Sequence, residues 1–206
     1  MTRIHTGHGA AGLTRFASDV DALVHDNSDE HRLTALVADR LRALLASEVT
    51  LPPEFTQPHT DHYVVYPLHV ATDGSFSIVS AVWDVGQTTP VHGHETWGVV
   101  GIYAGVEHET RYVKPAAPDI PLVATVEHEW HRGQVTICCT TDDDVHRVDC
   151  AGETPCVGVH VYGADVGTLP RRWYEPDTGR QHWFISGWAT PPANRRSASS
   201  ARGPEW

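Results

Sequence analysis

The hydrophobic pattern of the first fifty residues indicates helices. Between residues 13 and 49 apolar side chains recur every three or four positions, and most charged side chains fall off that stripe. The segment 27–29 (Asn-Ser-Asp) suits an N-cap, so we expect a short helix over 18–25 and a longer one after the cap. The prolines in 51–53 (Leu-Pro-Pro) end the helical part, because proline cannot donate a backbone hydrogen bond. The stripe comprises Leu33, Leu36, Val37, Leu41, Leu44, Leu45 and Val49.

From residue 62 onward the pattern is typical of strands. Short runs rich in β-branched and aromatic residues are separated by turn residues and do not alternate with helical segments. This favours an antiparallel sandwich or barrel and predicts a mainly β protein. Residues 163–188 contain three tryptophans and are expected to fold back onto the barrel as a loop. The predicted strands are 62–70, 75–83, 97–103, 106–113, 121–126, 134–140, 145–149 and 156–162.

The same patterns divide the chain into three parts. Residues 1–55 are expected to form a helical segment packed on the barrel, and residues 56–189 the β domain. Residues 190–206 read as a polar C-terminal tail.

Composition and charge narrow the function classes. Apolar residues make up 40% of the 206, which is enough for a core. Fifteen Lys and Arg against 26 Asp and Glu give a net charge of −11 without any basic run, so we expect no nucleic-acid partner and no membrane partner. The single lysine, Lys114, lacks the glycine-rich surroundings of a phosphate-binding loop.

Hydropathy and cysteine content bear on the compartment. No apolar run is long enough for a transmembrane helix or forms a secretory signal, so the expected location is the cytoplasm. The four cysteines lack a CxxC spacing and are therefore expected to be reduced thiols.

Histidine is the unusual residue, with 15 copies. His92 and His94 flank Gly93, and this spacing places two imidazoles on one face of an extended segment, where both can bind one metal ion. His146, near the start of a later predicted strand, is the candidate third ligand. Six others are expected to be structural or on the surface: His59, His62, His69, His108, His128 and His131.

The spacing around this pair resembles the first cupin motif, G-x5-H-x-H-x3,4-E-x6-G. Gly86, His92, His94 and Gly105 match it, and Gly98 stands in place of the glutamate. The resemblance to the cupin superfamily implies a double-stranded β-helix, or jelly-roll, barrel with the N-terminal helices added.

Further segments are similar to the thiol dioxygenase (cysteine dioxygenase-like) family of cupins, whose metal site lacks the acidic ligand. Residues 157–162 resemble its S-x-H-x-Y segment, with Gly158 in place of the serine, and residues 146–148 resemble its H-R-V segment. Gly98 has no sulfur, so the cysteine–tyrosine crosslink of the animal enzymes cannot form here. Segments 96–101 and 174–179 are similar to the bacterial members.

The resemblance implies a non-haem Fe(II) dioxygenase that adds both atoms of O2 to the sulfur of a small thiol, giving a sulfinic acid. The thiol would be cysteine or resemble 3-mercaptopropionate. His92, His94 and His146 would bind the iron, Tyr162 would act in catalysis through its hydroxyl, and His160 would orient Tyr162.

Substrate contacts are less well defined by the sequence. The family's carboxylate anchor, an Arg or Gln, should fall close to Tyr66, and neither type is there. Tyr66 and Trp97 are the candidate substrate contacts, and Arg171 or Arg172 could replace the anchor.

Two other functions share the same histidines. One is a three-histidine cupin that cleaves carbon–carbon bonds of a chelating, non-thiol substrate, and the other is a non-catalytic metal-binding cupin. Three-histidine sites also suit zinc, nickel and copper. The expected assembly is a monomer or a small homo-oligomer.

Overall fold

Two helices precede the β part of the chain. The computed structural model describes residues 8–47, 49–140 and 144–191, beginning with α1 (His8–Asp26) and α2 (Glu30–Ala46). Asp29 caps α2 as expected, because its side chain accepts a 2.7 Å hydrogen bond from the backbone N–H of Arg32. The prediction of a short first helix is wrong: α1 has 19 residues, because its apolar side chains pack against α2 and the sheet. Of the predicted tail, residues 192–206 lie outside the described residues.

Eleven strands in the described residues form two antiparallel sheets. The five-stranded sheet has the order β1-β2-β9-β4-β7, and the six-stranded sheet has the order β11-β10-β3-β8-β5-β6. The prediction of a mainly β fold with N-terminal helices is confirmed. The 3-10 turn η1 (Pro53–Phe55) precedes the first strand. In chain order the strands are β1 (Val64–Val70), β2 (Ser77–Trp83), β3 (Val91–His92), β4 (Gly98–Ala104), β5 (Val106–Tyr112), β6 (Ala124–His131), β7 (Val135–Cys139), β8 (His146–Cys150), β9 (Cys156–Tyr162), β10 (Arg171–Tyr174) and β11 (Gln181–Phe184).

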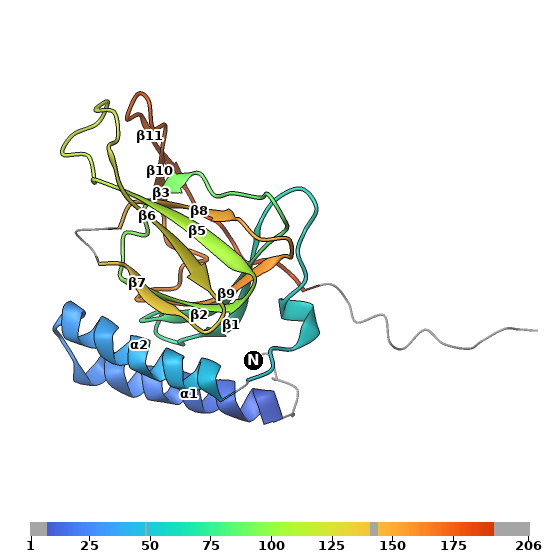
Figure 1. Cartoon of the computed structure of the whole chain (residues 1–206). Coiled ribbons are helices and arrows are strands. Elements are labelled where there is room, and N and C mark those ends of the chain that lie inside the picture. The colour runs from blue at the N-terminus through green and yellow to red at the C-terminus, as the bar shows by residue number, and fades with distance from the viewer. Residues whose placement is uncertain (1–7, 48, 141–143, 192–206) are drawn as a thin grey trace, which may run out of the picture.

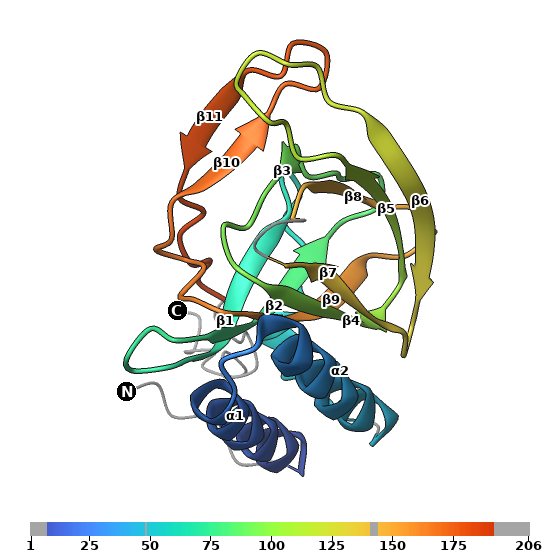
Figure 2. The same ribbon diagram turned by 90° about the vertical axis from the view of Figure 1, so that its left-hand side faces the viewer.

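The two helices lie against the outer face of the five-stranded sheet, and the inner face of that sheet looks toward the six-stranded sheet (Figures 1 and 2). Alternation along β9 shows the division: Val157, Val159 and Val161 join the core under the helices, while the intervening side chains face inward. On the neighbouring strand β4, a Cβ on Gly101 would lie 2.8 Å from a Leu45 methyl of α2, so glycine is needed for this close packing. The inward-facing positions are therefore the ones that can build a site.

Several predicted strand boundaries need correction. The sequence reading missed β3, whose two residues are too few to show a periodicity. The strand predicted at 121–126 begins too early, since β6 spans Ala124–His131. This strand lies at the edge of the sheet and is almost fully exposed. The segment 163–188 is more than a loop, since it contains β10 and β11, and β10 returns to pair with β3.

The prediction that all four cysteines are reduced thiols is wrong for one pair. Cys150 at the end of β8 and Cys156 at the start of β9 form a disulfide, with their Cα atoms 5.7 Å apart. The turn between the two strands brings these positions together without a CxxC spacing. Cys138 is buried and lies outside this disulfide.

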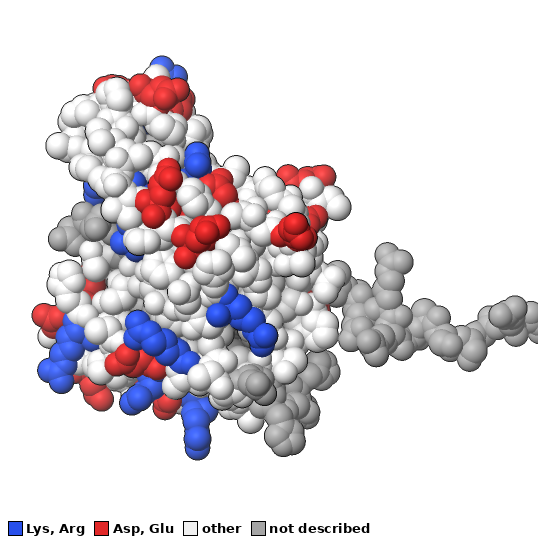
Figure 3. All heavy atoms as spheres, in the orientation of Figure 1, with Lys and Arg blue, Asp and Glu red and all other residues white. Residues whose placement is uncertain are grey.

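The surface over the helices carries both signs of charge. Figure 3 shows Lys, Arg, Asp and Glu side chains interspersed there, and mostly acidic ones above, with no continuous basic area on this face. Among the described helices, none is both long and apolar enough to cross a lipid bilayer.

Candidate metal centre

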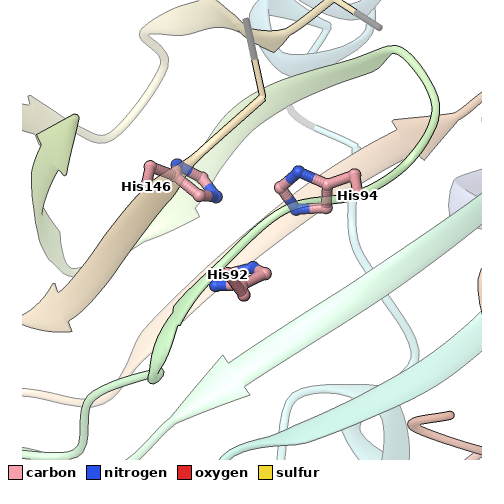
Figure 4. Close-up of side chains that lie close together, drawn as sticks. All are labelled: His92, His94 and His146. Atoms are coloured by element: carbon pink, nitrogen blue, oxygen red, sulfur yellow. The ribbon is translucent and has the colours of Figure 1, made fainter. Parts of the chain in front are cut away.

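The three histidines singled out by the sequence converge between the sheets (Figure 4). His92 and His146 are opposite each other in the pairing of β3 with β8, and His94 follows in the next loop. The three ring centroids form a nearly equilateral triangle with sides of 4.8, 4.9 and 4.9 Å. One nitrogen from each ring lies within 4.8 Å of the others, a span that ring rotations can close onto a single ion.

Hydrogen bonds and burial prepare these imidazoles to bind a metal. The Nδ1 of His92 lies 3.0 Å from the Pro90 carbonyl oxygen, which leaves its Nε2 available. The Nδ1 of His94 is buried and has no hydrogen-bond partner in the described structure, as expected for an atom that awaits a ligand. The pKa values of His92 and His94 lie well below 6.5, and burial is the largest cause. Both imidazoles are therefore neutral, which is the form that coordinates metals.

A buried ion pair holds the loop that carries His94. Oδ2 of Asp144 accepts hydrogen bonds from the backbone N–H groups of His94 and Glu95, each at 3.0 Å, and Oδ1 lies 2.8 Å from the Lys114 ammonium. A Cβ on Gly93 would lie 3.0 Å from the same carboxylate, so glycine allows this close approach. The only lysine therefore has a structural role, and it lies outside any phosphate-binding loop.

Glu109 orients the third histidine, and no sequence motif marks it as part of the site. The Oε1 of Glu109 lies 2.8 Å from Nδ1 of His146, and its Oε2 accepts a 2.9 Å hydrogen bond from the Trp130 indole. Burial raises the pKa of Glu109. The hydrogen bond with His146 and the electrostatic effects of His146 and Arg111 outweigh burial and lower this pKa from 4.5 to about 2. Glu109 is thus a carboxylate that accepts a hydrogen bond from Nδ1 of His146, which directs Nε2 of His146 into the site.

We expect the substitution Glu109→Gln to weaken metal binding about 10- to 100-fold, because a neutral amide accepts the His146 proton less strongly. Titration with Zn²⁺ against a chromophoric chelator measures this. The matched control is Glu129→Gln, a carboxylate on the exposed strand β6, which should leave the affinity unchanged. Equal affinities for both variants would show that Glu109 does not support the site.

Tyr162 and His160 also face this cavity, as their spacing on β9 requires. The Tyr162 hydroxyl lies 2.9 Å from Nδ1 of His160, and the Tyr162 ring stacks on His94 with centroids 5.0 Å apart. Burial, the largest cause, lowers the pKa of His160 to about 3, so it is neutral. Gly98 is opposite Tyr162 in the pairing of β4 with β9, which is the position from which a crosslinking cysteine would act.

The two candidate substrate contacts do not reach the cavity. Tyr66 points to the other face of β1, where it packs against Phe55 and donates a 2.9 Å hydrogen bond to the Gln57 carbonyl oxygen. Trp97 is buried in the core under the helices. The residues of the β1 region that do line the cavity are Tyr63 and Val65, because neighbouring residues of a strand point to opposite faces.

A buried cation lies beside the three histidines. Arg171 on β10 is 5% exposed and lines the cavity beside the three histidines, where its charge lowers the pKa of His92 and His94. Its guanidinium lies over the Phe184 ring, 4.8 Å from the centroid, and donates to Ser186 at 2.8 Å. Arg172 instead points away and makes two hydrogen bonds to the Glu95 carboxylate.

In the part of the chain that the structure describes, the histidines form a cluster without an acidic member. No carboxylate or thiolate joins His92, His94 and His146 within ligand distance. The complete lining of the cavity is Tyr63, Val65, Val79, Ala81, Trp83, Thr89, His92, His94, His146, Val148, His160, Tyr162, Val166 and Arg171.

Three solved structures that are similar to this chain share 10–16% of its sequence. No known protein-family profile matches the sequence. A conserved uncharacterised protein with a double-stranded β-helix domain from Klebsiella pneumoniae is 15% identical, with 64% of this chain and 91% of that chain covered and a TM-score of 0.40. A cupin superfamily protein from Desulfitobacterium hafniense is 10% identical, with 56% and 90% covered and a TM-score of 0.42. An oxalate oxidase in complex with the substrate analogue glycolate is 16% identical, with 57% and 63% covered and a TM-score of 0.39. The chain is a mainly β protein of two antiparallel sheets with two N-terminal helices, and the solved structures that it resembles are cupin double-stranded β-helix proteins.

Proposed function

We propose that this protein is a non-haem Fe(II) thiol dioxygenase that converts a small carboxylate-bearing thiol into its sulfinic acid. The observation that supports this most is the content of one cavity: three histidines that no acidic side chain among the described residues joins, the Tyr162–His160 pair, and the Arg171 cation. In the reaction both atoms of O2 end on sulfur, the thiol sulfur gives up four electrons and O2 accepts four. The stoichiometry therefore needs no external reductant.

The neutral ligand set suits an anionic substrate. Ferrous iron held by His92, His94 and His146 would supply the redox chemistry that lets O2 react with a thiolate. Because no carboxylate among the described residues joins the cluster, the protein ligands do not offset the 2+ charge. That charge favours the thiolate form of the substrate over the thiol.

Arg171 supports a substrate with a second negative charge. A buried guanidinium can hold a carboxylate through two parallel hydrogen bonds, which positions the ligand as well as attracting it. Arg171 lines the same cavity as the histidines, because β10 pairs with β3. The pairing continues into the loop after β3, where the N–H of Gly93 donates to the Arg172 carbonyl oxygen at 2.9 Å. A thiol acid with the sulfur and the carboxylate a few bonds apart matches this pair of sites.

Tyr162→Phe is expected to lower kcat about tenfold or more while the metal content stays unchanged, because the hydroxyl interacts with the reacting groups and with His160 but is not a ligand. Steady-state oxygen uptake and elemental analysis of the same samples measure the two quantities. Tyr103→Phe is the matched control, since the Tyr103 hydroxyl accepts a hydrogen bond from the Leu51 backbone N–H under the helices. Unchanged kinetics of the Tyr162 variant would remove this hydroxyl from the mechanism.

An oxygen-electrode screen tests the function itself. Protein loaded anaerobically with Fe(II) is mixed with cysteine, 3-mercaptopropionate, mercaptosuccinate or cysteamine, and the sulfinic acid is identified by mass spectrometry. We expect oxygen uptake only with thiol present, and the fastest uptake with a thiol acid. Uptake with a chelating diketone and no thiol would assign the protein to carbon–carbon bond cleavage instead. A loaded protein that consumes no oxygen with any of these compounds would favour a non-catalytic metal-binding role.

A further inference from the structure

Glu107 is a buried acid that the proposed reaction does not yet use. It lies on β5 and is 2% exposed, two residues from Glu109 and on the same inward face. Its Oε1 is fully buried and has no hydrogen-bond partner in the described structure. A buried carboxyl oxygen without a hydrogen-bond partner destabilises the fold, so we look for a polar group nearby that could pair with Glu107.

The second atom of this kind is Nε2 of His160. It is also buried and has no hydrogen-bond partner among the described residues, whereas Nδ1 of the same ring contacts Tyr162. A Cβ built on Gly158 would overlap Nε2 of His160 and would lie 3.0 Å from Oε1 of Glu107. Nε2 of His160 and Oε1 of Glu107 thus both lie within 3.0 Å of this Cβ position. A water that makes a hydrogen bond to each of two atoms can bridge about 5.5 Å between them, which is enough for this pair. A small rotation or one such water would join them.

The protonation state of Glu107 gives this contact a direction. Burial, together with the charge of Glu109, raises the pKa of Glu107 from 4.5 to about 8, so the carboxyl is mostly protonated at neutral pH. A protonated carboxyl has one O–H to donate. The neutral imidazole of His160 has one nitrogen that accepts and one that donates.

We infer that Glu107 is a positioning residue that sets the tautomer of His160 and, through it, the direction of the Tyr162 hydroxyl. The O–H of Glu107 donates to Nε2 of His160, directly or through one water. His160 then carries its proton on Nδ1 and donates it to the Tyr162 oxygen. The Tyr162 O–H is left free to donate into the cavity, toward substrate or oxygen.

The opposite arrangement would have the opposite effect. If Nε2 of His160 carried the proton, Nδ1 would accept from Tyr162 and the hydroxyl would offer the cavity only an acceptor. Glycine at position 158 permits the inferred arrangement, because any side chain there would displace the His160 ring. Glu107 thereby supplies, from another strand, a polar partner for His160 that the serine of the S-x-H-x-Y segment would otherwise offer. The role in the reaction rests on the proposed function, whereas the tautomer does not.

The tautomer can be measured without any turnover. Long-range proton–nitrogen NMR spectra of the ¹⁵N-labelled full chain, metal-free and zinc-loaded, distinguish a protonated from an unprotonated ring nitrogen. The His160 signals are assigned as those absent from His160→Gln. We expect Nδ1 of His160 to be protonated and Nε2 to be an acceptor in the wild type at neutral pH. A proton on Nε2 in the wild type would overturn the inference, and this requires no variant to fold.

Two variants separate the hydrogen bond from the packing. Glu107→Gln keeps an N–H donor of the same shape and should preserve the wild-type tautomer, whereas Glu107→Leu removes the donor and should release Nε2 to carry the proton. With iron and thiol, kcat should fall about tenfold or more in the leucine variant only, at unchanged iron content. An unchanged His160 tautomer in the leucine variant would also refute the inference. If the oxygen screen fails but the tautomer is as expected, the reaction assignment falls while the Glu107–His160–Tyr162 arrangement stands.

Discussion

His92→Ala is expected to abolish stoichiometric metal binding, with at least about a 100-fold loss of affinity and loss of thiol-dependent oxygen uptake. The substitution removes one of three ligands, a larger change than the loss of an outer hydrogen bond to a ligand, which alone weakens sites 10- to 100-fold. Elemental analysis after dialysis against a weak chelator measures the metal content. The fold should survive, because the imidazole lies beside a cavity and its hydrogen bond is with the Pro90 backbone carbonyl rather than with a core side chain.

The control for this experiment is the substitution of an exposed histidine that does not line the cavity. His128→Ala changes an exposed side chain on β6 and should retain a full metal equivalent and full activity. Circular dichroism of both variants shows whether the sheets are intact. If the His92 variant still binds one equivalent of metal with wild-type affinity, the three-histidine assignment is wrong.

The histidine cluster could be predicted because its geometry is local or follows from one strand pairing. Two residues apart, His92 and His94 must point to the same side of an extended segment. His160 and Tyr162 are also two residues apart on one strand, and the hydrogen bond between them follows from the same alternation. The sequence could place His146 only through the cupin resemblance, because the pairing of β3 with β8 that brings it opposite His92 joins distant segments.

The outer parts of the site could not be predicted because no local pattern marks them. Glu107 and Glu109 alternate with His108 in a run that reads as a solvated surface, yet both are 2% exposed. Only the position of β5 between β8 and β6 turns this face toward the histidines. The side to which Tyr66 points could not be predicted for a related reason. Neighbouring residues of β1 face opposite ways, so Val65 lines the cavity and Tyr66 lies in the core.

The fold shows the same division between local and distant information. Long strands such as β2 and β9 were recognised from their composition, since each is buried on both faces. The segment holding β10 and β11 looks irregular in sequence because its strands are only four residues long, too short to show a clear alternation. Its tryptophans indicated that it packs against the rest of the protein, but not that it delivers Arg171 to the cavity.

Arg171→Met is expected to lower kcat/KM for a carboxylate-bearing thiol about 30- to 1,000-fold and to leave cysteamine, which has no carboxylate, nearly unaffected. Removing one partner of a buried charge pair costs about 2–4 kcal/mol, which corresponds to that range. Methionine keeps an apolar side chain that can still reach the Phe184 ring, over which the guanidinium lies in the wild type, so the barrel should persist. Oxygen-uptake kinetics with 3-mercaptopropionate and cysteamine on the same protein sample measure the ratio, and the second substrate serves as an internal control for folding and iron content.

The conservative variant decides how Arg171 acts. Arg171→Lys keeps the positive charge but loses the planar pair of donors, so we expect its activity with the thiol acid to lie between the wild type and the methionine variant. A general attraction of the cavity for anions would instead be restored fully by lysine. Equal losses for both substrates would mean that Arg171 only supports the fold, through its contacts with Ser186 and Phe184. The substrate would then be selected by the shape of the cavity alone, and a carboxylate would not be required. A selective loss would show that β10, a short strand between β11 and β3, determines which thiols this three-histidine site accepts.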